Sequence, residues 1–276
     1  MTAIMGIVNV TPDSFSDGGR YADADAAIAH GHRLLSAGAD LIDVGGESTR
    51  PGSERVDPAA EQQRVLPVVA ALAAAGATVS IDTMNAATAT AAIAAGARLV
   101  NDVSGGLADD DMFAAVAETS ADLAIGHWRG HATDMYARAD YDDVTAEVVA
   151  ELGARLDAAE AAGIPRERIV LDPGIGFGKR GEANWRVLSQ LPRLVALGPR
   201  VLVGTSRKRF LLDALSADTD ATAAAAEIDE RRRDLATAVT SVLAAQAGVW
   251  AVRVHDVTAT RDALRVARAW QEGAAL

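Results

Sequence analysis

Residues 78–102 read TVSIDTMNAATATAAIAAGARLVND and hold one complete structural unit. Two short apolar runs, 78–82 and 99–102, end in polar residues, and the alanine-rich stretch 86–96 between them has the period of a helix and stops at Gly96. Strand, loop and helix recur in this order eight times along the chain. The repetition predicts an α/β protein, a single-domain (β/α)₈ TIM barrel over residues 1–276.

Polar side chains stand where the predicted strands end. The strands are expected at 4–10, 41–45, 78–82, 99–102, 123–127, 169–172, 201–205 and 251–255, and the helices at 23–37, 58–75, 86–96, 110–119, 144–163, 183–197, 230–247 and 258–271. The strand ends carry Asn9, Asp43 with Glu47, Asp82, Asn101, His127, Asp172, Lys208 and His255. Barrel enzymes build their active sites at this face, so these residues form the candidate site.

The composition favours a cytoplasmic protein that binds small molecules. Hydrophobic residues make up 50% of the chain, enough to fill a barrel, and the sequence has no cysteine, which excludes disulfides and thiolate metal sites. The net charge of −12 argues against nucleic acid and anionic lipid as partners. No apolar stretch is long enough to span a membrane, and no signal peptide is expected.

Asp82, Asn101 and Asp172 each end a strictly apolar strand. A buried carboxylate or amide destabilises the fold unless it has a partner. Such residues can satisfy backbone groups or one another, so a structural role stays open for any one of them. Three of them facing one pocket favour a flat ligand with several N–H donors, such as a pterin or a guanine-like ring.

Cations gather late in the chain. Arg207, Lys208 and Arg209 fall at the start of a predicted helix, where they oppose the helix dipole and indicate a nearby anion. Arg253 and His255 alternate along the last strand and face the same way. Together with Arg50 they predict a phosphate site.

The run DPGIGFGK at 172–179 does not match a phosphate-binding loop. It is one residue short of GxxxxGK, and Arg180 follows it where Ser or Thr is required. We expect a flexible turn here. His127 alone predicts a core or turn histidine, and the lack of an HExxH motif or a Cys/His cluster argues against zinc.

Seven motifs give the chain its resemblance to the dihydropteroate synthases. They are NVTPDSFSDGG at 9–19, GGESTRPG at 45–52, SIDT at 80–83, NDVSGG at 101–106, LDPGIGF at 171–177, GTSRK at 204–208 and VRVHD at 252–256. The family joins p-aminobenzoate to 6-hydroxymethyl-7,8-dihydropterin pyrophosphate and releases pyrophosphate. The resemblance therefore implies a transferase of folate biosynthesis.

The resemblance also implies roles for individual residues. The pterin ring would be held by Asp82, Asn101, Asp172 and Lys208, and the pyrophosphate, with Mg²⁺, by Asn9, Arg50, Arg253 and His255; Asn9 would be the metal ligand. Two loops would close over p-aminobenzoate through Phe15, Asp17, Thr49, Arg50 and Pro51, with Ser206 and Phe177 beside the benzoate. The implied catalytic residues are Asp17, Lys208, Arg253 and His255. A homodimer is implied, with the helical stretch 235–247 as candidate contact.

Three positions depart from the family pattern, and one of them is Arg209, which stands beside the expected benzoate site where many members carry Ser. Asn85 stands where the family usually carries Lys or Arg, and Gly126 stands where a methionine usually packs on the pterin. Gly126 is expected to thin one wall of the pocket. Restoring methionine is expected to tighten pterin binding by about fivefold, or about 1 kcal/mol. If a neighbour such as Trp128 or Met135 already fills the space, the added side chain would overpack and weaken binding instead.

Two other functions remain open at this point. Methyltetrahydrofolate-dependent methyltransferases resemble the site at Asp82, Asn101 and Asp172, but they lack the two N-terminal loops. A non-catalytic pterin-binding paralogue would keep the same motifs without the activity.

Overall fold

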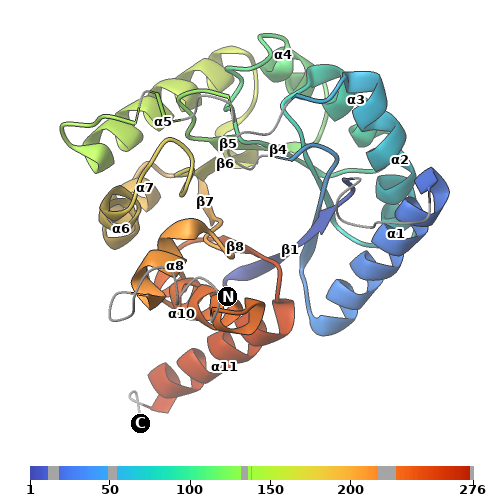
Figure 1. Ribbon diagram of the computed structural model, residues 1–276. Helices are drawn as coiled ribbons and strands as arrows, with labels where there is room; N and C mark the ends of the chain where they lie inside the picture. The colour runs from blue at the N-terminus through green and yellow to red at the C-terminus, as the bar shows by residue number, and fades with distance from the viewer. Residues whose placement is uncertain (12–18, 49–54, 132–135, 138, 217–227, 274–276) are drawn as a thin grey trace.

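A closed barrel of eight parallel strands, taken in chain order, forms the centre of the computed structural model (Figure 1). The structure describes residues 1–11, 19–48, 55–131, 136, 137, 139–216 and 228–273. The strands are β1 Ala3–Asn9, β2 Leu41–Gly45, β3 Val79–Asp82, β4 Leu99–Asp102, β5 Asp122–Gly126, β6 Ile169–Asp172, β7 Arg200–Val203 and β8 Ala251–Val254. The predicted barrel is confirmed, and each predicted strand lies within a residue or two of its position.

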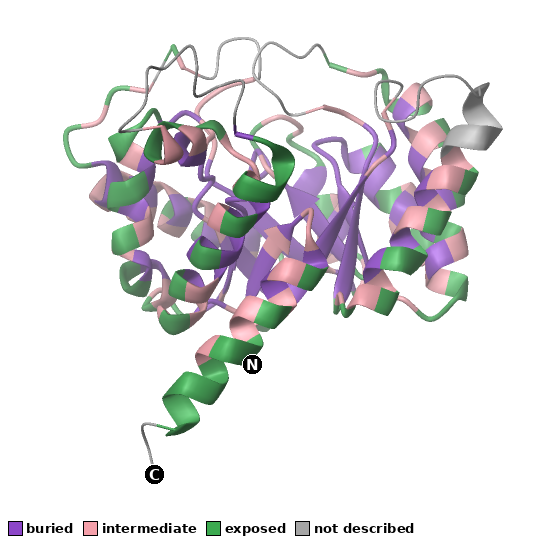
Figure 2. Ribbon diagram, turned by 60° about the horizontal axis from the view of Figure 1, so that its bottom comes forward, coloured by how far each residue is buried: buried purple, intermediate pink, exposed green. Residues whose placement is uncertain are grey.

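Helices surround the barrel, with their buried faces inward and their exposed faces outward (Figure 2). They are α1 Gly19–Ala37, α2 Pro58–Ala74, α3 Ala86–Ala94, α4 Met112–Ala117, α5 Val144–Ala161, α6 Glu182–Ser189, α7 Leu191–Val195, α8 Arg209–Leu215, α10 Glu230–Gln246 and α11 Val257–Gly273, with a 3₁₀ turn η2 at Arg166–Arg168. Among the described segments, no helix is long and apolar enough to cross a bilayer.

Two helices differ from the prediction. The single helix expected at 183–197 is divided at Gln190 into α6 and α7, because Pro192 has no backbone N–H to continue the first helix. A short helix, α8, occupies 209–215, which lies outside the eight helix ranges expected from the sequence. Two predicted helix starts are confirmed: Asp57 accepts hydrogen bonds from Ala59 and Ala60, and Asp143 caps α5 in the same way.

An apolar layer closes the barrel interior. Every strand except β3 contributes one residue to it: Met5, Leu41, Leu99, Ala124, Val170, Leu202 and Ala251. Side chains alternate along a strand, so the residue two positions further on faces the same interior. On four strands that residue is polar, namely Asp43, Asn101, Asp172 and Arg253. The apolar layer is thus the floor of the candidate site.

A cavity of about 350 Å³ lies at the opposite end of the barrel, next to Leu41, Leu99 and Trp250. Arg200 at its edge pairs with Asp122 at 2.8 Å and lies over the Trp250 ring at 4.6 Å. The N-terminal end of a TIM barrel serves stability rather than chemistry. The polar layer, not this cavity, marks the functional face.

Candidate active site

A buried arginine joins three strand ends at the mouth of the barrel. Arg253 donates from Nε to Oδ2 of Asp43 at 2.5 Å and from Nη2 to Oδ2 of Asp82 at 2.6 Å. The Asn101 amide donates to the same Asp43 oxygen at 3.0 Å. Oδ1 of Asp43 is buried and has no hydrogen-bond partner within the described part of the chain. The predicted neighbours Asp82 and Asn101 therefore meet in one cluster.

This cluster sets the charge of its members. Burial raises the pKa of Asp82 to about 7, and nearby Asp43 adds to the shift while Arg253 opposes it. Burial alone would lower the pKa of Arg253, but Asp43 and Asp82 hold it above its ordinary value. Arg253 therefore remains charged, whereas Asp82 titrates near neutral pH.

Asp172 and Lys208 form a second group beside the first. Oδ1 of Asp172 accepts the Gly174 N–H at 2.7 Å, and Nζ of Lys208 donates to the Ile175 carbonyl and lies 4.6 Å from the centre of the Phe177 ring. Partial burial lowers the pKa of Lys208 to about 8, while Asp172 opposes the shift. Burial raises the pKa of Asp172 against the effect of Lys208. A carboxylate, an ammonium and an aromatic face thus lie together.

Ser206 and His255 lie on the turn and strand end beside Lys208 and Arg253. Oγ of Ser206 is 2.8 Å from Nδ1 of His255 and accepts the His255 backbone N–H at 3.1 Å. This pair fixes the ring of His255 just past β8. The predicted neighbours Lys208, Ser206 and His255 are brought to one face.

Arg207 shapes the turn that presents Ser206 and Lys208. Its φ of 57° lies in the left-handed region, and its guanidinium pairs with both oxygens of Asp234 at 2.8 Å. Glu230 adds a third contact at 3.0 Å. The sequence analysis expected an anion near the cations at 207–209. For Arg207 this anion belongs to the protein itself, and Arg209 is exposed.

The remaining predicted residues divide into two groups. Asn9 ends β1 opposite Gly45 of β2 and is partly exposed at the same face. Five predicted residues lie outside the described part of the chain: Phe15, Asp17, Thr49, Arg50 and Pro51. The sequence analysis placed Asp43 in the candidate site but gave it no specific role, although its two-residue spacing from Leu41 puts it on the inward face.

Asn85 belongs to a buried network next to loop 45–57. Its amide donates to Oε2 of Glu61 at 2.7 Å, and its carbonyl oxygen accepts from Nη2 of Arg55 at 2.8 Å. Nε of Arg55 also pairs with Glu47 at 3.1 Å. Asn85 thus joins the carboxylate of Glu61 to the guanidinium of Arg55.

Gly126 ends β5 directly against the backbone of Val103. A Cβ at position 126 would lie 2.5 Å from the Val103 carbonyl oxygen and 2.7 Å from its Cα. Backbone atoms cannot move aside as the end of a side chain can. The expectation that methionine would simply restore a missing wall and tighten binding is therefore wrong.

The comparisons with known proteins agree with this geometry. Residues 5–255 match the family model described as pterin binding enzyme. The dihydropteroate synthase of Mycobacterium leprae is 51% identical over 97% of this chain and 93% of its own length. The chain belongs to the dihydropteroate synthase family. The family's motifs supply the polar layer, since SIDT, NDVSGG, LDPGIGF, GTSRK and VRVHD carry Asp82, Asn101, Asp172, Lys208 and Arg253.

Solved structures of family members share the whole barrel. The synthase of Xanthomonas albilineans with 4-aminobenzoic acid superposes with a TM-score of 0.87 at 44% identity, covering 98% of this chain and 93% of that one. The same organism's enzyme in complex with 7,8-dihydropteroate gives a TM-score of 0.81 at 41% identity, covering 98% and 94%. The resemblance and the fold predicted from sequence are both confirmed.

Gly126→Ala should lower the free energy of unfolding by about 1–3 kcal/mol, because the added methyl group meets the Val103 backbone. Gly153→Ala in α5 is the matched control, since nothing lies within 4 Å of a Cβ there. That control should stabilise the protein by roughly 0.5–1 kcal/mol. Urea denaturation measures both. Equal stability of Gly126→Ala and the parent would show that β4 and β5 can separate at this point.

Proposed function

We propose that the chain synthesises 7,8-dihydropteroate from 6-hydroxymethyl-7,8-dihydropterin pyrophosphate and p-aminobenzoate, with release of pyrophosphate. The observation that carries the proposal is the cluster of Arg253, Asp43, Asp82 and Asn101 beside the Asp172–Lys208 pair. The barrel that carries this cluster matches solved structures of synthases with 4-aminobenzoic acid and with 7,8-dihydropteroate. Mixing both substrates with the purified protein and identifying dihydropteroate by mass tests it.

The pterin ring suits the inner part of the site. It presents several N–H donors and one carbonyl, which pair with the carboxylates of Asp82 and Asp172, the amide of Asn101 and the ammonium of Lys208. The Phe177 ring, 4.6 Å from Lys208, adds an apolar face. A ligand that satisfies buried polar groups also restores the hydrogen bonds they lost with water.

The pyrophosphate end suits Asn9, Arg50, Arg253 and His255, with Mg²⁺ as the cofactor. Within the described ranges no three His, Asp or Glu side chains could hold a metal together. Mg²⁺ bound to phosphates needs only one or two protein oxygens, and the Asn9 amide can supply one. When bound, Mg²⁺ would neutralise charge on the leaving pyrophosphate.

The chemistry needs no strong base. The bond between the methylene carbon and the pyrophosphate oxygen breaks first, and the electron-rich pterin delocalises the positive charge. The neutral amine of p-aminobenzoate then forms the new carbon–nitrogen bond and loses one proton to solvent. The charges of Arg253 and Lys208, with a hydrogen bond from the His255 ring, stabilise the departing charge. Phe15, Asp17, Thr49, Arg50 and Pro51 would shelter the reacting carbon, with Ser206 beside the benzoate.

The rival functions give different results in the same assay. A non-catalytic paralogue would bind pterin without forming dihydropteroate. A methyltransferase would consume methyltetrahydrofolate instead. Family membership favours the synthase, and we place its activity in the cytoplasm.

A homodimer is supported by an exposed apolar stripe. Leu235, Val239 and Leu243 recur every four residues on α10 and are more than half exposed. Val266 and Trp270 are also exposed apolar residues, on α11, which packs against α10 and extends beyond the barrel (Figure 2). Apolar patches of this kind mark contact surfaces between proteins.

Asp172→Asn should weaken binding of a dihydropterin by roughly 5- to 150-fold, or about 1–3 kcal/mol, because the new amide faces a ligand donor with its own donor. Calorimetric titration measures the affinity. Asp157→Asn, on the exposed face of α5, is the control and should bind as the parent does. Unchanged affinity of Asp172→Asn would remove that residue from the ring site.

Chelation of divalent metal should abolish turnover and leave binding of the free pterin alcohol unchanged, because the metal partners only the pyrophosphate. Added Mg²⁺ should restore activity. Turnover rate and calorimetric affinity are measured on one sample. Loss of alcohol binding on chelation would place the metal at the ring instead.

The parent protein should scatter light as a particle of twice the 28.5 kDa chain mass. Val239→Asp puts a charge in the apolar stripe and should give monomer. Leu107→Asp is the control, because Leu107 is also exposed but lies in the loop before α4. A monomeric parent at micromolar concentration would refute the dimer.

A further inference from the structure

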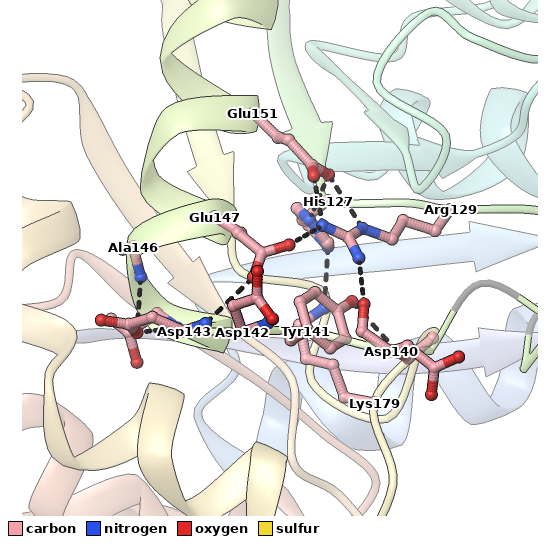
Figure 3. Close-up of polar contacts among 12 residues, drawn as sticks. His127, Arg129, Asp140, Tyr141, Asp142, Asp143, Ala146, Glu147, Glu151 and Lys179 are labelled. Carbon is pink, nitrogen blue, oxygen red and sulfur yellow. Dashed lines mark hydrogen bonds and ion pairs between the residues drawn. The ribbon is translucent and has the colours of Figure 1, made fainter.

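Lys179 is a buried lysine that the proposed reaction does not use. It is only 1% exposed, at the end of the loop that follows β6. Its Nζ lies 2.8 Å from Nδ1 of His127 and donates to the carbonyl oxygens of Gly174 and Phe177 at 3.0 Å each (Figure 3). An ammonium has three protons, and this one has three acceptors. The flexible turn expected at 172–179 is instead held from within.

The hydrogen bonds fix where the protons lie. Burial works against the charge of Glu151, but bonds from His127 and Arg129 lower its pKa to about 2, so it is a carboxylate and only accepts. Nε2 of His127, 2.8 Å from Glu151, therefore carries a hydrogen. Burial and the neighbouring Lys179 lower the pKa of His127 to about 4, which leaves Nδ1 bare. Lys179 must then be the donor to Nδ1, and with its charge it can donate to all three acceptors at once.

Arg129 ties this chain of bonds to two other segments. It pairs with Glu151 and with Glu147 of α5, the latter at 2.7 Å, and donates to the Asp140 carbonyl at 2.9 Å. Its guanidinium lies 3.9 Å from the centre of the Tyr141 ring, and the Tyr141 hydroxyl donates to the Gly178 carbonyl at 3.0 Å. The loop after β6 is thus fastened to α5 and to the segment after β5 (Figure 3).

The fastened loop is the one that holds Lys208. The two carbonyls bound by Lys179, those of Gly174 and Phe177, stand on either side of Ile175. The Ile175 carbonyl accepts from Nζ of Lys208, and the Phe177 ring lies against the same ammonium. Any movement of the loop therefore moves both contacts of Lys208.

We propose that Lys179 is a positioning residue for Lys208: bound to His127, and through His127 to Glu151, it fixes loop 173–178 so that the Ile175 carbonyl and the Phe177 ring hold the Lys208 ammonium in place for the pterin. The kinetic part of this proposal rests on the proposed function. The placement of Lys208 does not depend on turnover and can be measured without it.

Loss of one proton from Lys179 leaves two N–H donors for its three acceptors, so one of the three contacts that fasten the loop is lost. Burial lowers the pKa of Lys179 to about 7; Asp172 and Glu151 oppose the shift, and Lys208 and Arg129 add to it. Because the folded pKa lies below the ordinary value of 10.5, keeping Lys179 charged costs stability; this cost is fully present below pH 7 and is relieved as pH rises from about 7 toward 10.5. The loop is thus most firmly fastened below that pH.

Amine-directed labelling reads the two lysines separately, since Lys179 and Lys208 are the only lysines in the chain. In the parent, Lys208 should label with a midpoint near pH 8 and Lys179 should stay unlabelled. Lys179→Met keeps the apolar length and removes the three donors. We expect the Lys208 midpoint to rise by about one pH unit and the KM for the pterin substrate to rise about tenfold.

Two further variants complete the test. Glu151→Gln keeps an acceptor for His127 and removes the charge, so it should move the Lys208 midpoint in the same direction by a smaller amount. Glu160 lies on α5, as Glu151 does, and pairs with Arg166 of η2 near the surface. Glu160→Gln removes this ion pair and should change neither the Lys208 midpoint nor the KM. If Lys179→Met does not fold, the Lys208 midpoint and the KM of Glu151→Gln decide the proposal.

The outcomes are distinct. The proposal is overturned if the labelling midpoint of Lys208 is unchanged in folded Lys179→Met. If kcat falls while that midpoint stays the same, Lys179 acts in the chemical step itself. A parent that forms no dihydropteroate overturns the proposed function alone, because the labelling result still stands.

Discussion

The ion pairs of Arg253 with Asp43 and Asp82 are the constraint on which the barrel mouth depends. The strand that carries Arg253 pairs with β1 and β7, not with β2 or β3, so its side chain reaches across the barrel interior to both carboxylates. Isolated charges in such a place cost on the order of several kcal/mol each. Each of the three is tolerated because the others are present, so the fold and the site share the same residues.

The same contacts couple the two ends of the substrate. Asp82 is proposed to face the pterin, and Arg253 the pyrophosphate, yet they are bonded to each other at 2.6 Å. A pyrophosphate that draws on Arg253 weakens the partner that opposes the raised pKa of Asp82. Binding at one end therefore changes the charge at the other, and such linkage acts equally in both directions. The assumption of two independent half-sites does not fit this geometry.

The sequence predicts which face a residue occupies better than which atoms it meets. Alternation along the strands correctly placed Asp82, Asn101 and Asp172 at the barrel mouth. It could not show that Asp43 would share Arg253, because partners across a barrel depend on its closure and stagger. Gly126 was misjudged for a related reason: a missing side chain indicates space, but only coordinates show the Val103 backbone filling it. The burial of Lys179 likewise depends on a loop whose path no periodicity reports.

Three of the loops that carry proposed substrate residues are anchored in one way. In each loop a cation reaches a carboxylate, either directly or through one other side chain. Arg55 pairs directly with Glu47 and reaches Glu61 of α2 through Asn85. Lys179 reaches Glu151 of α5 through His127, and Arg207 pairs directly with Asp234 of α10. The strands fix the floor of the site by register, whereas these loops have no ladder of hydrogen bonds to hold them. Directional, charge-assisted bonds replace that ladder. In each case at least one of the carboxylates lies on a helix, Glu61 on α2, Glu151 on α5 and Asp234 on α10, so the outer helices hold the loops that the strands cannot.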